Sequence, residues 1–293
     1  MYELVQLSEH DFYVDSPTKV GIIRTGNGDD VVLIDSGNNK DAGKRLLRII
    51  EQQGWHLTAV FNTHSHADHI GGNRYLVDHT DCKVYAYGVE QAFTATPVLE
   101  PAILYGGFPY PGIRHRFLMA QEAPAAFMTP EVLPAGMEII PLPGHSFDMV
   151  GFRTADNNVF LADALCSQET LDKYAMVVQW DIAAYCETLG TVSEMQAAHF
   201  IPSHAPVTED IAPLATYNLE AMQSVIEKII GWCEKPTSFE QLLKRAFDAD
   251  GLKMNELQHE LIGFTLRNYL SYLAALGEIA CRFEDNVMLW QTV

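Results

Sequence analysis

The chain has 293 residues, of which 48% are hydrophobic and 19% are charged, a balance that predicts one large globular domain or a domain with an appendage. Its 38 Asp and Glu outnumber its 19 Lys and Arg, so the formal net charge is −19 and the isoelectric point is near 4.8. Because the basic residues are scattered singly or in pairs, this charge argues against sequence-independent binding of nucleic acid.

The cysteines and the N-terminal sequence narrow the class of protein further. Five cysteines, an odd number, are widely spaced and include no C-x-x-C, so the sequence indicates neither a disulfide framework nor a cysteine zinc knuckle. The sequence begins without a basic segment and apolar run of the secretory kind, and it contains no apolar run of 18 residues. We therefore expect a soluble cytoplasmic protein with neither a membrane nor a nucleic acid as partner.

Short apolar runs and helical patterns alternate along the first 210 residues. The runs that predict strands are 20–24, 31–35, 59–63, 83–87, 138–142, 159–163 and 200–202. The patterns that predict helices are 42–53, 72–79 and 182–196. This alternation is typical of layered α/β folds.

Two stretches of this region resemble each other. Arg-Thr at 24–25 precedes the apolar run that ends at Asp35, and Arg-Thr at 153–154 precedes the run that ends at Asp163. Each stretch reads as a strand, a polar turn and a second strand that ends in aspartate. Either a structural duplication or two unrelated hairpins with similar turn chemistry would explain the likeness.

Residues 89–134 have a different composition, with many prolines, glycines and aromatic residues. A long irregular stretch within a domain is usually a lid or a pocket wall, and the aromatic content argues against disorder. We expect this segment to cover a binding site. It could also simply pack against the domain or form a dimer contact.

Beyond about residue 212 the pattern becomes helical. We expect helices at 217–234, 239–248, 255–262 and 266–276, followed by a hairpin of strands at 278–283 and 287–290. Helices followed by a hairpin resemble a winged-helix module, but residues 237–293 contain five Lys and Arg against eight Asp and Glu. Packing or homodimer formation is therefore the better interpretation than DNA binding. The predicted domains are 1–212 and 213–293.

Residues 63–72, T-H-S-H-A-D-H-I-G-G, crowd three histidines and an aspartate into six positions. His64 and His66 lie two residues apart just past a predicted strand, so their imidazoles project to the same side. The following turn can bring Asp68 and His69 toward a second point close by. This spacing is typical of metal ligands.

Three further residues follow predicted strands in the same manner: His145, Asp163 and His204. Ligands carried on the ends of separate strands are held rigidly. In order and spacing, the whole set resembles the seven metal ligands of the metallo-β-lactamase superfamily: His64, His66, Asp68, His69, His145, Asp163 and His204. The resemblance covers about residues 1–210. It implies an αβ/βα four-layer sandwich with a metal site along one edge of the paired sheets, here carrying a winged-helix-like extension.

The resemblance also implies roles for these residues. One metal ion would take His64, His66 and His145, the other would take Asp68, His69 and His204, and Asp163 would bridge the two. Imidazole and carboxylate ligands without a thiolate suit zinc, with iron or manganese as alternatives. Two such ions can share a hydroxide that attacks a substrate carbonyl. We expect Asp68 and Asp35 to serve catalysis, Asp35 by orienting ligands as a matching family aspartate is thought to do; a turn-capping role is the alternative for Asp35.

The choice of branch within the superfamily depends on other features. A bridging aspartate is similar to that of glyoxalase II, the zinc lactonases and the tRNA-processing nucleases. Glyoxalase II binds the carboxylates of glutathione with Arg and Lys, and no compact basic set after residue 205 matches those residues. A nuclease needs a positive surface for its phosphate chain, and this chain is acidic. A redox enzyme of the diiron kind is also disfavoured, because neither its flavodoxin-like domain nor a glutamate ligand is evident.

The expected lid segment supplies an apolar and aromatic set instead: Leu104, Tyr105, Phe108, Tyr110, Phe117, Leu118, Met119 and Phe127. We therefore expect hydrolysis of a small ester, thioester or lactone with a hydrophobic part. Arg114 and Arg116, beside His115, could hold a substrate carboxylate or lie in solvent. The alternatives are a phosphodiesterase or ribonuclease, or a regulatory protein that binds through its tail.

Overall fold

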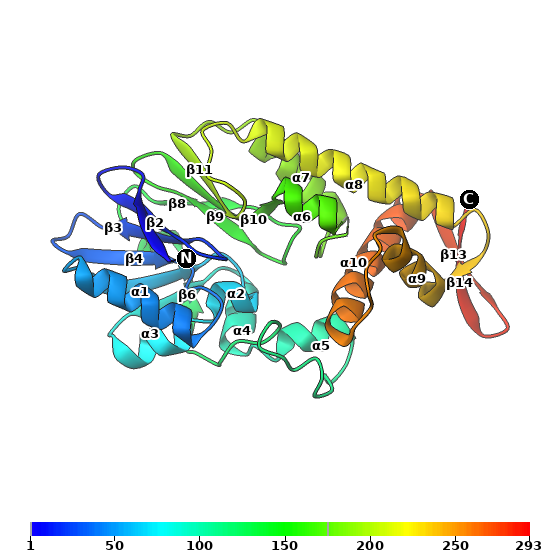
Figure 1. The fold of residues 1–293 in the computed structure, drawn as a ribbon, viewed down its shortest axis with the longest axis horizontal. Coiled ribbons are helices and arrows are strands. Elements are labelled where there is room, and N and C mark those ends of the chain that lie inside the picture. The colour runs from blue at the N-terminus through cyan, green and yellow to red at the C-terminus, as the bar shows by residue number, and fades with distance from the viewer. Residues whose placement is uncertain (1, 175) are drawn as a thin grey trace.

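Two β-sheets face each other in the computed structural model, which describes residues 2–174 and 176–293 (Figure 1). The first sheet has seven strands in sequential order: β1 (Glu3–Gln6), β2 (Asp11–Asp15), β3 (Val20–Arg24), β4 (Asp30–Ile34), β5 (His56–Asn62), β6 (Lys83–Ala86) and β7 (Ala126–Phe127). The first four strands pair antiparallel, and β4 to β7 pair parallel. The sequence predicts four of these strands and misses the short strands β1, β2 and β7.

The second sheet has the order β11-β10-β9-β8, with bounds β8 (Glu138–Pro141), β9 (Val150–Arg153), β10 (Asn158–Cys166) and β11 (His199–His204). Apolar side chains from both sheets fill the space between them, including the buried rings of Phe61, Phe152 and Phe160. The sheets come so close that a Cβ at Gly21 would lie 2.8 Å from the ring of Phe160. Glycine is therefore required on β3 at this point.

Helices cover the outer faces of both sheets, which gives the predicted αβ/βα sandwich. The first sheet carries α1 (Lys40–Gln52) and α3 (Asn73–His79), and the second carries α7 (Ile182–Ser193) and α8 (Ala212–Trp232). Helix α1 begins where the side chain of Asn39 accepts a hydrogen bond from the backbone N–H of Ala42 (2.9 Å). Its buried residues Ala42, Leu46 and Ile50 recur every four positions, as expected for a helix with one face on a sheet.

The two similar stretches of sequence occupy corresponding places in the two sheets. Strands β3 and β4 form an antiparallel hairpin, and β5 then pairs parallel to β4. Strands β9 and β10 form a second antiparallel hairpin, and β11 pairs parallel to β10. The repeated sequence pattern thus corresponds to a repeated topology, which favours the duplication over unrelated hairpins.

Residues 89–134, which we call the lid segment, contain more regular structure than the sequence indicates. They include α4 (Glu90–Ala95), α5 (Leu99–Tyr105), strand β7 and a 3-10 turn at Pro130–Val132. The expectation of a long irregular stretch is therefore wrong in part. Both helices have only six or seven residues, too short for a clear periodic signal.

The C-terminal region comprises α8, β12 (Thr237–Ser238), α9 (Phe239–Ala249), α10 (Glu256–Ala275), β13 (Ile279–Glu284) and β14 (Val287–Thr292). The terminal hairpin is confirmed, but the prediction of separate helices at 255–262 and 266–276 is wrong, because α10 continues through Gly263. A glycine in a helix costs about 1 kcal/mol relative to alanine. Here the neighbouring Ile262, Phe264 and Leu266 are all buried, and their packing offsets that cost.

One hydrophobic core runs from the second sheet into the C-terminal region. It contains Leu161 of β10, Leu189 of α7 and Ile229 of α8, together with Leu243 of α9 and Leu270 of α10. Helix α8 extends from the sandwich to the terminal hairpin (Figure 1). No helix in the described part of the chain is both long enough and apolar enough to cross a lipid bilayer.

Candidate metal centre

All seven residues that the sequence singles out lie close together, in or just after the ends of strands from both sheets. His64 and His66 follow β5, Asp68 and His69 lie in the short helix α2 (Ala67–Ile70), His145 follows β8, Asp163 lies in β10, and His204 ends β11. Strand β10 is irregular here: Ala162 has φ 50°, and the pairing with β11 shifts register between Ala162 and Cys166. Irregularities of this kind redirect a side chain, here the carboxylate of Asp163.

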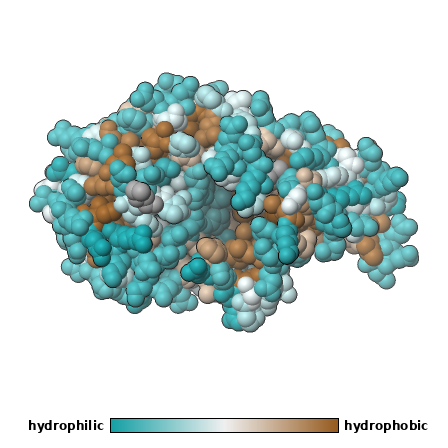
Figure 2. All heavy atoms as spheres, in the orientation of Figure 1, coloured by the Kyte–Doolittle hydropathy of each residue, from teal (hydrophilic) through white to brown (hydrophobic). Residues whose placement is uncertain are grey.

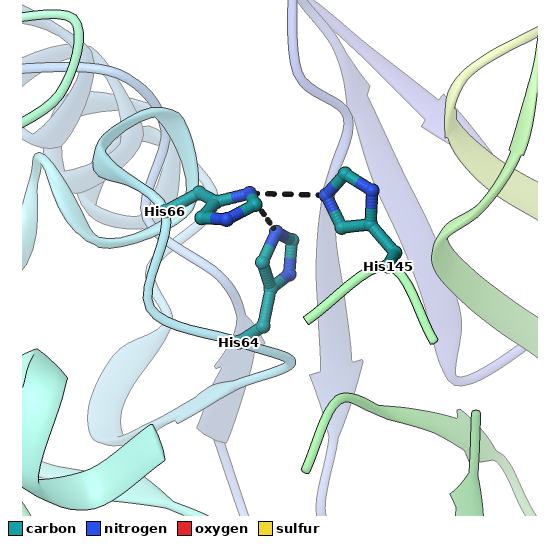
Figure 3. A group of neighbouring side chains, drawn as sticks. All are labelled: His64, His66 and His145. Carbon is teal, nitrogen blue, oxygen red and sulfur yellow. Dashed lines mark hydrogen bonds between the residues drawn. The ribbon is translucent and has the colours of Figure 1, made fainter. Parts of the chain in front are cut away.

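Three histidine nitrogens converge in the first group (Figure 3). Nδ1 of His66 lies 3.0 Å from Nε2 of His64 and 3.0 Å from Nε2 of His145. In a tetrahedral zinc site with bonds of about 2.0 to 2.1 Å, two ligand nitrogens lie about 3.3 Å apart. The observed spacing is close to that value.

The second group is formed by Asp68, His69 and His204. Oδ2 of Asp68 lies 3.1 Å from Nε2 of His204 and 3.7 Å from Nε2 of His69. The carboxylate of Asp163 lies between the two groups. Its Oδ1 is 3.1 Å from Nε2 of His69, and its Oδ2 is 3.3 Å from Nε2 of His204 and 3.6 Å from Nε2 of His145.

Acceptors outside the cluster fix which ring nitrogen turns inward. Nδ1 of His145 donates to the carbonyl of Val178 (2.9 Å), and Nδ1 of His204 donates to the carbonyl of Pro17 (3.0 Å). A carbonyl only accepts, so Nδ1 carries a proton, and in the neutral form of each ring the lone pair is on Nε2, which faces the cluster. His66 is reversed, with Nε2 3.3 Å from Oε1 of Glu100 and Nδ1 facing inward.

Asp35 lies directly beneath the cluster. Its Oδ1 accepts from the backbone N–H of Thr63, and its Oδ2 accepts from the hydroxyl of Thr63, both at 2.8 Å. Oδ2 is also 2.7 Å from Nδ1 of His69, and the Thr63 oxygen is 3.0 Å from Nδ1 of His64. Asp35 thus contacts His69 directly and His64 through the hydroxyl of Thr63, as an orienting role requires and a turn cap does not.

Two buried polar atoms at the centre of the cluster lack a hydrogen bond. Nε2 of His69 and Oδ1 of Asp163 are 3.1 Å apart, but the angles do not form a hydrogen bond between them or with any other described atom. Buried polar atoms are normally paired. With nitrogen and carboxylate donors only, the cluster fits a divalent cation of the zinc, iron or manganese kind.

The side chains divide sharply in their affinity for protons. Burial lowers the pKa of His145 to about 3, and the neighbouring His66 adds to this effect. Burial also acts to lower the pKa of His204, but the carboxylates of Asp163 and Asp68 outweigh it and raise the value to about 10. In the same way Glu100 raises the pKa of His66 to about 9 against the effect of burial. A cation that binds these rings therefore displaces protons.

A cavity of about 260 Å³ opens beside the cluster. One side is formed by His66, Asp68, His145 and Asp163. The other side is largely apolar and comes from the lid segment, from residues 166–178 and from α10: Phe117, Leu118, Cys166, Val177, Val178, Leu257 and Leu261. The surface is hollowed between the sandwich and the C-terminal helices (Figure 2). Within the described lining there is no Lys or Arg.

The predicted lid residues divide between several environments. Phe117 and Leu118 line the cavity, whereas Leu104 and Leu118 pack against Phe264 of α10 in a small separate core. Phe108 is 81% exposed. The lid segment thus packs against the C-terminal region rather than against the sandwich alone. Arg114, His115 and Arg116 are exposed and do not line the cavity; the two guanidinium groups lie over the rings of Phe108 and Phe117.

Sequence reasoning missed several residues of the site. Glu90 and Glu100 are buried acids in the lid segment, and Leu257 and Leu261 bring α10 to the cavity. The two glutamates could have been noticed in the sequence, because they are acidic residues within an otherwise apolar segment. The contact of α10 with the site had no local signal, because it depends on how distant parts of the chain pack.

Comparison with known proteins supports this description. The family model of the Metallo-beta-lactamase superfamily matches residues 14–212. A Beta-lactamase-like protein 2 homolog from Drosophila melanogaster is 23% identical over 192 residues, which cover 63% of this chain and 58% of that protein. A Hydroxyacylglutathione hydrolase from Rhodopseudomonas palustris is 25% identical over 199 residues, 62% of this chain and 69% of that protein. The chain thus spans less than two thirds of the Drosophila relative.

Solved structures resemble the whole chain. A Beta-lactamase domain protein from Burkholderia ambifaria has a TM-score of 0.77 at 16% identity, covering 99% of this chain and 94% of that one. A metallo-beta-lactamase family protein from Thermus thermophilus has a TM-score of 0.73 at 14% identity, covering 98% of this chain and 100% of that one. At these identities the likeness shows the fold alone, and it extends over the C-terminal region.

Proposed function

Because the chain belongs to the metallo-beta-lactamase superfamily, we propose that it is a dinuclear metal-dependent hydrolase of small esters, thioesters or lactones with an apolar part. The observation that carries the proposal is the junction of two ligand groups at Asp163, beside a cavity with an apolar wall. Neither feature alone defines the substrate. Together they favour hydrolysis, at the ligand groups, of a substrate whose apolar part binds against the apolar wall of the cavity.

Each ligand group would hold one cation. His64, His66 and His145 form the first group, and Asp68, His69 and His204 form the second, with Asp163 in reach of both. Zinc suits these ligands, with iron or manganese as alternatives. Two divalent cations in this position would lower the pKa of a water molecule and polarise a carbonyl oxygen.

The protein's own groups hold protons and orient water around this centre. Asp35 keeps the proton of His69 on Nδ1, so that Nε2 faces inward. Asp68 lines the cavity, and its side chain is 38% exposed, so its carboxylate can accept a hydrogen bond from a water molecule there and orient it. The hydroxyl of Thr18 donates to Oδ2 of Asp68 (2.8 Å) and holds this carboxylate in place.

The cavity supports a small and uncharged substrate. Its volume of about 260 Å³ lies below the range of about 300 to 1,000 Å³ that is typical of sites for drug-sized ligands. Its described lining combines apolar side chains with the acids Asp68, Glu100 and Asp163 and includes no Lys or Arg side chain that would bind a phosphate or carboxylate. Phosphodiesters and substrates with several carboxylates are therefore poor candidates.

The test combines metal analysis with a substrate panel. We expect about two equivalents of zinc after reconstitution, and hydrolysis of short apolar esters, thioesters or lactones that greatly exceeds hydrolysis of phosphodiesters. His66→Ala should abolish most of this activity, whereas His56→Ala, at an exposed histidine outside the cluster, should retain it. One equivalent of metal or less, or full activity in His66→Ala, would count against the proposal.

A further inference from the structure

Two buried glutamates stand behind the three-histidine group. Glu90, the first residue of α4, is fully buried, and Glu100 of α5 is 8% exposed. Among the described residues neither makes an ion pair with Lys or Arg; the one ion pair of Glu100 is with His66. A carboxylate is costly to bury unless it is paired or hydrogen-bonded, so the partners of each glutamate indicate what that glutamate holds in place.

Glu90 joins the two loops that carry the three histidines. Its Oε2 accepts from the backbone N–H (3.0 Å) and hydroxyl (2.5 Å) of Ser65, which lies between His64 and His66. Its Oε1 accepts from the hydroxyl of Ser146 (2.5 Å), the residue after His145, and from the backbone N–H of Asp148 (3.2 Å). The carboxylate therefore sets the spacing between the loops.

Glu100 acts on one ring. Its Oε1 lies 3.3 Å from Nε2 of His66, so a proton held there leaves Nδ1 free to face His64 and His145. His66 is thus held from the lid segment. The three ligands of this group are neutral when they bind a cation, whereas the second group includes the carboxylate of Asp68. Without further acids, the first group would have only its share of Asp163 to offset two positive charges.

We propose that Glu90 and Glu100 are positioning residues for the three-histidine group, and that their negative charges give this group its affinity for a divalent cation. Glu90 fixes the distance between the loops, and Glu100 fixes the orientation of the His66 ring. The inference rests on the proposed dinuclear centre. It adds that the three-histidine group depends on two carboxylates that are not themselves among the proposed metal ligands.

The experiment measures metal binding rather than turnover. Glu90→Gln and Glu100→Gln keep the shape of each side chain and remove its charge. The control is Asp11→Asn, at a buried carboxylate that accepts from Asn158 (2.7 Å) and Thr154. Asp11 begins β2 at the end of the sheet opposite Pro17 and Thr18, which contact the cluster. Stepwise zinc affinities come from competition with a chelator, and cadmium-113 NMR of cadmium-loaded protein distinguishes a nitrogen-rich site from an oxygen-rich one.

We expect each glutamine variant to weaken one of the two zinc-binding steps at least about tenfold, as loss of a partner behind a ligand usually does, and to shift or abolish the nitrogen-rich cadmium resonance. The other step should change little, and Asp11→Asn should leave both steps unchanged. Equal affinities in all four proteins, or equal weakening of both steps, would overturn this inference alone. Fewer than two equivalents of metal in the unaltered protein would overturn the dinuclear centre and this inference with it. Glu100→Gln provides the result if Glu90→Gln does not fold.

Discussion

Asp35 illustrates how much one side chain decides at this site. It has φ 66°, a left-handed conformation that asparagine and aspartate tolerate better than other non-glycine residues. Its carboxylate only accepts, so the hydroxyl and N–H of Thr63 and the Nδ1–H of His69 must all point toward it. This arrangement turns Nε2 of His69, rather than Nδ1, toward the centre of the cluster.

Asp35→Asn should therefore lower the affinity for metal about 10- to 100-fold, the usual effect of losing a partner behind a ligand. The asparagine amide donates where the carboxylate accepted, which favours the tautomer of His69 with a proton on Nε2. Zinc titration against a chelator measures the loss. Asp30→Asn is the matched control, because Asp30 contacts His56 (2.9 Å) on the exposed surface. Equal affinity in the two variants would contradict the assigned role.

At the scale of elements, α10 has two functions along its length. Its first turns carry Leu257 and Leu261 into the wall of the cavity, whereas Leu266 and Leu270 lie in the main core. It also contacts α5, the helix that carries Glu100. The C-terminal region therefore takes part in the site, a role that a charge count could not reveal.

Leu261→Ala should enlarge the cavity and shift the preference of the enzyme toward substrates with a longer apolar part. In a series of esters with increasing acyl length, we expect kcat/KM for the longer members to rise relative to the shorter ones. Leu270→Ala is the control: it should lower the free energy of unfolding by about 2 to 5 kcal/mol, the usual cost of a cavity in a core. If both variants keep the original length preference, α10 does not select the substrate.

At the scale of the whole molecule, the shared core decides how far the predicted domains 1–212 and 213–293 are independent. The core cluster includes residues of β10 and α7 as well as residues of α9 and α10. Separable domains normally have cores of their own. The boundary at 212 therefore marks where α8 begins, and it does not mark a gap in the packing.

Deletion of residues 237–293 should destabilise the remaining chain, because it uncovers core residues of α7 and α8 such as Leu189 and Ile229. We expect a large drop in melting temperature or aggregation, measured by circular dichroism and light scattering. A truncated protein that melts like the full chain and keeps its zinc would show instead that the tail is a separate module. The proposed packing role of the tail would then be wrong.

Local pattern predicts the alternation of strands and helices, whereas the sandwich and the full set of seven residues are implied by the resemblance to a known family. Strand β3 is predicted with its observed bounds, and each clustered residue lies in or close after an element that periodicity identifies. Glu90 could not be found in this way, because its partners Ser65 and Ser146 come near it only after folding. The prediction of two helices, 255–262 and 266–276, is wrong for a related reason: the periodic pattern is local, and the packing that holds α10 together as one helix is not.

The cavity wall formed by α10 has a consequence for how this protein can change. The groups that would cleave the bond come from strand ends within residues 35–204. Two residues of the apolar wall, Leu257 and Leu261, come from α10, further along the chain. Part of the substrate selectivity can thus change without any change in the stretch that carries the reactive groups. Substitution of Leu257 or Leu261 during evolution could therefore change the preferred substrate while the residues of the metal centre remain the same.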